Sequence, residues 1–227
     1  MIEARPETLL QVWFSPLFPT GAFAYSHGLE QAQESSWVID AAQLQEWLKD
    51  LITAGSIRSD IALASIAHRA AESGDDALLK KAAELALALA PSAERSLETI
   101  QQGNAFAAAI RSAWPCEAIT RLGALWPGDL ALPVAAGVSA AGHAIARGKF
   151  LNAFATGTLC NLVSAAIRLG ITGQTGGQRT IAALAGILAA QAEALHDASA
   201  DDIWSGTFMS DLASLQHETQ YTRLFRS

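Results

Sequence analysis

Two adjacent residues near the start of the chain, Ser26 and His27, carry the side chains of a nucleophile and a general base. A hydrolase nucleophile elbow places its serine in Gly-x-Ser-x-Gly between a strand and a helix. Here the flanking residues are Ala24 and Gly28, and no strand pattern precedes them. Hydrolysis would also need an acidic residue to orient the histidine and an oxyanion site, which the sequence does not supply. We therefore predict no catalytic residue.

The pair lies in an irregular segment, residues 14–30, in which two prolines and Gly21 precede a helix start. The rings of Phe23 and Tyr25 alternate there with that of His27. Two interpretations stay open: the rings fill the core at a well-packed helix start, or they face outward and bind a partner. On the second interpretation, the candidate partner-binding residues of this segment are Phe23, Tyr25, Ser26, His27 and Glu30.

A glycine-rich segment, residues 173–180, resembles a phosphate-binding loop only superficially. That loop needs a glycine, four residues and then Gly-Lys-Ser/Thr after a strand, whereas this segment continues with Gln178-Arg179 and follows a helix. We predict a structural turn between two helices, in which the glycines supply positive φ angles and close approach. Because two amides at i, i+4 can fix a turn or present donors, the candidate partner-binding residues here are Gln174, Gln178 and Arg179.

The last residues, 215–227, form a third segment of interest. A zincin helix would need His-Glu-x-x-His, but Tyr221 occupies the closing position, so a metalloprotease is excluded. The segment combines an aromatic residue, two arginines and a Leu-Phe pair, which is a mixture typical of interfaces. We expect an ordered, partner-facing tail. Its candidate partner-binding residues are His217, Glu218, Tyr221, Arg223, Leu224, Phe225 and Arg226.

The metal-ligating residue types show no ligand pattern. The five histidines lack i, i+4 pairing and neighbouring thiols. Cys116 and Cys160 lack CxxC spacing, which predicts buried thiols in a reducing compartment rather than a zinc site or a disulfide. We predict no metal site and no cofactor.

The elements that position these segments are predicted to be helices. Alanine makes up about a fifth of the 227 residues and there are only five valines, a composition that favours helix over strand. Apolar spacing with Asp40 and Gly55 at its ends predicts one helix, and Gly74, Pro91 and Ser92 mark further helix ends. We expect an all-α bundle of roughly eight to ten helices with an irregular N-terminal segment, forming one domain over residues 1–206, followed by a tail over 207–227 that orders on a partner.

Charge and hydropathy exclude further classes. A net charge of −7 without a Lys/Arg cluster argues against nucleic-acid binding. The uncharged stretches 130–146 and 150–167 contain prolines, glycines or polar residues, so buried bundle helices explain them better than membrane spans. The N-terminus lacks the cationic and apolar regions of a signal peptide, so we expect a cytoplasmic location.

Taken together, the three segments resemble the family of the urease accessory protein UreF. The resemblance spans nearly the whole chain, with Thr20, Leu215 and Gln216 as departures from the usual residues. The motifs that carry it are Ser15-Pro16-x-x-Pro19-x-Gly21-x-Phe23-x-Tyr25-Ser26-x-Gly28-Leu29-Glu30, Asn161-Leu162-Val163-Ser164-Ala165-Ala166 with Gly173-Gln174-Thr175-x-Gly177-Gln178, and His217-Glu218-Thr219-Gln220-Tyr221-x-Arg223-Leu224-Phe225-Arg226-Ser227.

The resemblance implies an all-α homodimeric protein without enzymatic activity of its own. Such a protein joins UreD (UreH in some organisms) and the GTPase UreG in the complex that inserts nickel into apo-urease, and it regulates GTP hydrolysis. Its C-terminal tail would become ordered against UreD. Arg179 and Arg223 are nominal candidates for an arginine finger, with salt bridging as the alternative. An independent helical nickel metallochaperone that uses His27 or His217 is the competing function.

Overall fold

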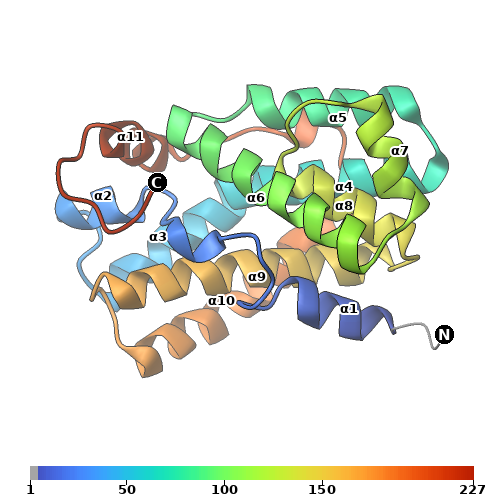
Figure 1. Ribbon diagram of the computed structural model, residues 1–227. Coiled ribbons are helices and arrows are strands. Elements are labelled where there is room, and N and C mark those ends of the chain that lie inside the picture. The colour runs from blue at the N-terminus through green and yellow to red at the C-terminus, as the bar shows by residue number, and fades with distance from the viewer. Residues whose placement is uncertain (1–4) are drawn as a thin grey trace.

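The computed structural model describes residues 5–227, and within that range the chain forms helices and no strand (Figure 1). The predicted all-α, single-domain bundle is confirmed. The α-helices are α1 (Pro6–Trp13), α2 (Leu29–Glu34), α3 (Ala41–Ala54), α4 (Ser56–Ser73), α5 (Asp76–Ala88), α6 (Ala93–Ala113), α7 (Glu117–Leu125), α8 (Leu132–Gly142), α9 (Arg147–Arg168), α10 (Gln174–Ala194) and α11 (Phe208–His217), with short 3-10 helices η1 (Ala22–Ala24) and η2 (Ala200–Asp202).

Several helix ends follow the signals in the sequence. The Asp40 side chain caps α3 by accepting hydrogen bonds of 2.9 Å from the amides of Ala42 and Gln43. Gly74 ends α4 in the left-handed conformation, with a φ of 71°. The Ser92 hydroxyl caps α6 by accepting the amide hydrogen bond of the residue three positions on. Local chemistry therefore sets one boundary of each of these three helices.

The core is built around α4, which packs most extensively against α8 and also contacts α3, α5 and α9. Residues Pro133–Ala140 of α8 are all buried. A Cβ added at Gly137 would lie 2.5 Å from the backbone oxygen of Ala64 in α4, so the two helices can approach this closely only at a glycine. The Ala- and Gly-rich composition thus permits packing of backbone close to backbone.

The uncharged stretch 150–167 lies in α9. By length and composition alone, α9 is the one helix among residues 5–227 that could cross a membrane, and half of its most apolar window is buried. It packs against α10, α4 and α8. Burial between helices accounts for its apolar composition.

Two local predictions were wrong. The segment 173–180 is not a turn with positive φ angles, because α10 begins at Gln174 and takes Gly176 and Gly177 into its first turn. The left-handed glycine of this connection is Gly170, with a φ of 78°. Close approach does occur, since a Cβ added at Gly177 would lie 2.9 Å from side chains of α9. The segment needs glycine for space rather than for backbone freedom.

The expectation that both cysteines are buried was also wrong. Cys160 is exposed and Cys116 is partly exposed. Cys160 lies on the outer face of α9, whereas its neighbours Leu159 and Leu162 face the core. The apolar character of the surrounding stretch concealed this outward face.

The irregular segment runs from Phe14 to Gly28 between α1 and α2, interrupted only by η1. At the other end of the sequence, α11 packs beside α2, and the final residues return to the same region (Figure 1). Ser26 and Ser227, 201 positions apart, are hydrogen-bonded there. The fold therefore joins two of the three segments singled out in the sequence.

Candidate functional site

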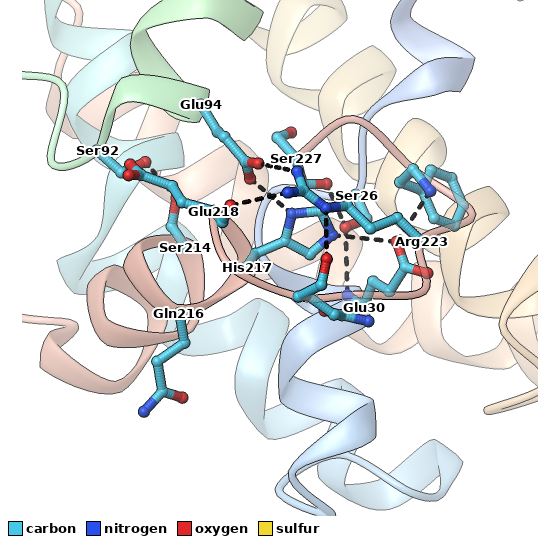
Figure 2. Close-up of polar contacts among 12 residues, drawn as sticks. Ser26, Glu30, Ser92, Glu94, Ser214, Gln216, His217, Glu218, Arg223 and Ser227 are labelled. Atoms are coloured by element: carbon cyan, nitrogen blue, oxygen red, sulfur yellow. Dashed lines mark hydrogen bonds and ion pairs between the residues drawn. The ribbon is translucent and has the colours of Figure 1, made fainter.

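The C-terminal residues 218–227 fold back onto α2 and α6 through a buried set of polar contacts, here called the tail clasp (Figure 2). Its members are Ser26, His27, Glu30, Glu94, Arg95, Glu98, His217, Glu218, Arg223 and Ser227. The residues come from the irregular segment, α2, α6, the end of α11 and the tail. The clasp thus connects both ends of the sequence to one helix in its middle.

His217, the last residue of α11, lies at the centre of the clasp and is completely buried. Its Nδ1 is 2.6 Å from the Glu94 carboxylate, and its Nε2 is 3.1 Å from the Glu30 carboxylate (Figure 2). The two carboxylates thus lie within hydrogen-bonding distance of opposite nitrogens of the ring. His217 thereby connects α2 to α6 through α11.

Glu30, in the first turn of α2, binds the tail backbone directly. Its carboxylate accepts hydrogen bonds from the amides of Leu224 at 2.6 Å and Phe225 at 2.8 Å. Phe225 is buried, and the Arg168 guanidinium lies 4.3 Å from the centre of its ring. A buried carboxylate and an aromatic anchor together fix the path of the last residues.

Arg223 closes the tail loop on α6. Its Nη1 donates to Glu94 Oε1 at 2.6 Å, while Nη2 donates to the carbonyl of Glu218 at 2.7 Å. The Glu218 carboxylate in turn accepts from the amide of Ala93 at 2.8 Å, where its negative charge complements the N-terminus of α6. Of the two arginine-finger candidates, Arg223 thus forms an ion pair within this chain.

The chain terminus is held at Glu98. Ser227 donates its hydroxyl to Glu98 at 2.7 Å, and Arg95 pairs with the same carboxylate at 2.6 Å. Burial opposes ionisation of Glu98, but Arg95 and then His27 outweigh it and hold the pKa of this carboxyl well below its usual range. Glu98 therefore stays ionised as the anionic centre of this end of the clasp.

His27 contacts a serine other than its sequence neighbour. Its Nε2 lies within hydrogen-bonding distance of the Ser56 hydroxyl, and its Nδ1 is 3.6 Å from Glu98. Burial, followed by the charge of Arg95, lowers the pKa of His27. Ser26 instead donates its hydroxyl to the backbone oxygen of Ser227. Ser26 and His27 are thus not hydrogen-bonded to each other as a nucleophile and its base.

The candidate residues divide by exposure. Tyr25 is buried and donates its hydroxyl to Gln101, whereas Phe23 is 70% exposed. Tyr221 is fully exposed and Leu224 is 63% exposed. Arg226 is exposed, with its backbone amide bonded to the carbonyl of the residue before Tyr25. The tail therefore contains both residues that are buried against the bundle and residues whose side chains face the solvent.

The third segment does not join the clasp. Gln174, Gln178 and Arg179 are exposed at the start of α10 and take no part in the hydrogen bonds of the clasp. Three residues of the clasp were not predicted from the sequence, namely Glu94, Arg95 and Glu98. The sequence pattern that could have identified them is the spacing of polar residues at i, i+1 and i+4 on α6, which places them on one face of the helix. Thr99 and Gln102 continue this polar face, and all five residues are buried.

A cavity of about 310 Å³ adjoins the clasp. Phe18, Phe23 and Phe106 contribute to its apolar lining, and His27 and Arg95 to its polar lining. Across residues 5–227, no group of three or more His, Cys, Asp or Glu side chains is arranged to hold a metal ion. The clasp therefore consists of hydrogen bonds and ion pairs, many of them buried, that hold residues 218–227 against α2 and α6.

Comparison with known proteins identifies the family of this chain. A family model described as UreF matches residues 38–185. A protein named urease accessory protein UreF from Methylobacterium radiotolerans is 48% identical over 225 residues, covering 99% of this chain and 98% of the relative. Proteins of the same name from Xanthobacter autotrophicus and Brucella ovis are 48% and 47% identical, covering 98% and 96% of this chain and 92% of each relative. The chain belongs to the UreF family of urease accessory proteins.

Proposed function

We propose that this chain is a non-enzymatic scaffold and regulator of urease maturation that acts in the cytoplasm. In this role it forms a homodimer and joins UreD (UreH) and the GTPase UreG in a complex on apo-urease. It modulates GTP hydrolysis and the transfer of nickel into the enzyme. Family membership over nearly the full chain supports the accessory role, and the tail clasp is the observation that supports the scaffold role.

The clasp supports this role because it fixes a surface that would otherwise be a flexible terminus. Buried anchors at His217 and Phe225 hold the segment, while Tyr221 and Leu224 project into solvent. A prearranged segment loses less conformational entropy when it binds a partner than a disordered one does. Tyr is also among the residue types that contribute most to binding energy at interfaces.

The surface of α11, next to the tail, exposes large apolar side chains of the kind found at protein–protein interfaces. On α11, Phe208, Met209 and Leu215 are exposed, and Phe208 reaches 73%. Large exposed apolar side chains gathered on one element are uncommon on surfaces that contact only water. We assign α11 and the tail as the surface that a protein partner covers.

Co-expression with UreD and UreG homologues tests this assignment. The wild-type chain should co-purify with both, and the double variant Tyr221→Ala, Leu224→Ala should not. The matched control is Val12→Ala, which truncates an exposed apolar residue on α1 at the other end of the molecule (Figure 1). Circular dichroism should show unchanged helicity in all three chains.

Two outcomes would contradict the proposal. A wild-type chain that elutes alone in the presence of both homologues would refute the scaffold role. A double variant that retains both partners as well as the control does would refute the role of the tail. Equilibrium dialysis of the chain with nickel separates the competing function, because an independent metallochaperone binds the ion stoichiometrically without partners.

A further inference from the structure

The cavity beside the tail clasp combines an aromatic wall with a small number of polar groups. Its volume of about 310 Å³ is at the lower end of the range of about 300–1,000 Å³ that is typical of small-molecule sites. Leu17 and Phe23 line the cavity and are largely exposed, so they lie at its rim. Its other aromatic lining residues are Trp13, Phe14, Phe18, Phe106 and Phe154. The cavity therefore has the size and the apolar surface to hold a compact organic molecule.

The aromatic wall is formed by rings that pack on one another. Phe106 is buried in α6, and the centre of its ring lies 5.0 Å from that of Phe18 and 5.9 Å from that of Trp13. The face of an aromatic ring attracts a cation as well as an apolar group, because its π electrons carry partial negative charge. This wall can therefore accommodate the apolar part of a ligand beside a positive charge.

The Asp60 carboxylate, in α4, lines the cavity without a hydrogen bond from any residue in 5–227. Its side chain is 23% exposed, and the nearest nitrogen of Arg95 is 3.9 Å away. Burial raises the pKa of Asp60 to about 6 from 3.8, and the charge of Arg95 offsets only part of this effect. An additional cation in the cavity would therefore stabilise the ionised carboxylate.

The other charged groups around Asp60 leave its negative charge uncompensated. Arg95 lies 2.6 Å from Glu98 and holds the pKa of that carboxyl well below its usual range, so these two charges cancel. Burial lowers the pKa of His27, which favours its neutral form at pH 7. Asp211, which lines a second cavity of about 150 Å³ together with Asp60, adds a carboxyl group rather than a cation. At neutral pH the polar side of the cavity therefore has an excess of negative charge.

We propose that this cavity binds a small organic ammonium ion, with its apolar part against the aromatic wall and its ammonium group donating hydrogen bonds to the Asp60 carboxylate. The ammonium supplies the donors and the positive charge that this carboxylate lacks within the chain. An uncharged ligand of the same shape would leave the charge of Asp60 uncompensated, and an anion would meet the carboxylates of Asp60 and Glu98. This site does not depend on the proposed function.

Binding of phenethylammonium to the full-length chain tests the proposal, with phenethyl alcohol as the uncharged ligand of similar shape. Calorimetry at pH 7.5 should show at least about tenfold tighter binding of the ammonium, because hydrogen bonds between charged groups are the stronger ones. Asp60→Asn should remove this preference, whereas the control Asp50→Asn, which changes an exposed carboxylate on α3, should keep it. At pH 5 the wild-type chain should lose most of the preference, since Asp60 is then largely protonated.

The position of the bound ligand can be measured at Cys160, which lines the cavity, whereas Cys116 is not among its lining residues. Phenethylammonium should slow the alkylation of Cys160 by iodoacetamide and leave that of Cys116 unchanged, as followed by mass analysis. No binding at millimolar concentration, equal affinity for the two ligands, or binding that Asp60→Asn leaves unaltered would overturn the proposal. If Asp60→Asn does not fold, the wild-type chain decides: an affinity independent of pH, or no protection of Cys160, would overturn it.

Discussion

The Glu30→Ala substitution should open the tail without unfolding the bundle. The Glu30 carboxylate is buried and accepts two hydrogen bonds from tail amides, those of Leu224 and Phe225, as well as the contact from His217. Hydrogen bonds to a charged group each contribute about 1.5–3 kcal/mol. The loss of two therefore costs at least about 3 kcal/mol. Since 1.4 kcal/mol corresponds to a factor of ten, the open tail should become more than about a hundredfold more populated.

Native-state hydrogen exchange measures this opening directly. The amides of Leu224 and Phe225 should lose at least about a hundredfold of their protection, whereas amides in α4 should keep theirs, because local opening leaves the core closed. Glu46→Ala is the matched control, since Glu46 is exposed on α3 and, among residues 5–227, pairs only with Lys49. Unchanged protection of the two tail amides in Glu30→Ala would refute the account of the clasp.

Three further outcomes follow from the packing and charge. Burial raises the pKa of Asp60 to about 6 from 3.8, so the folded state binds the proton more tightly and stability falls as pH rises from about 4 to 6. Asp60→Asn should thus stabilise the protein at pH 7 by at most about 3 kcal/mol, and urea unfolding at pH 7 and at pH 3 should show the gain only at the higher pH. Tyr25→Ala should cost about 3–5 kcal/mol in urea unfolding and Phe23→Ala about 0.5 kcal/mol or less, because only the first is buried. Gly137→Ala should lower the melting temperature, since the added methyl would meet the backbone of Ala64, whereas an alanine at the open Gly186 of α10 should not.

The helical class and many helix ends were predictable because they depend on local chemistry. Asp40, Gly74 and Ser92 terminate helices through their own side chains or backbone freedom, and no distant contact is needed. The start of α10 was misplaced because glycine signals both turns and close helix contacts, and the sequence does not distinguish these uses.

Two of the three parts of the clasp were predictable from the sequence, and the third, on α6, was not. The tail and the irregular segment stood out by composition, and the structure joins them at Ser26 and Ser227. Their common partner on α6 did not stand out, because charged residues on a helix are usually solvated. Glu94 contacts His217 and Glu98 contacts Ser227, so the environment of both carboxylates depends on contacts between residues more than a hundred positions apart.

The role of the tail in assembly is tested by the composition of the complex that forms on co-expression with UreD and UreG homologues. The full-length chain is compared with a chain that ends at His217, and size exclusion with light scattering gives the mass of each assembly. We predict that the full-length chain assembles with both homologues, while the shortened chain stays helical and elutes without them. An assembly of the same mass with and without residues 218–227 would contradict it.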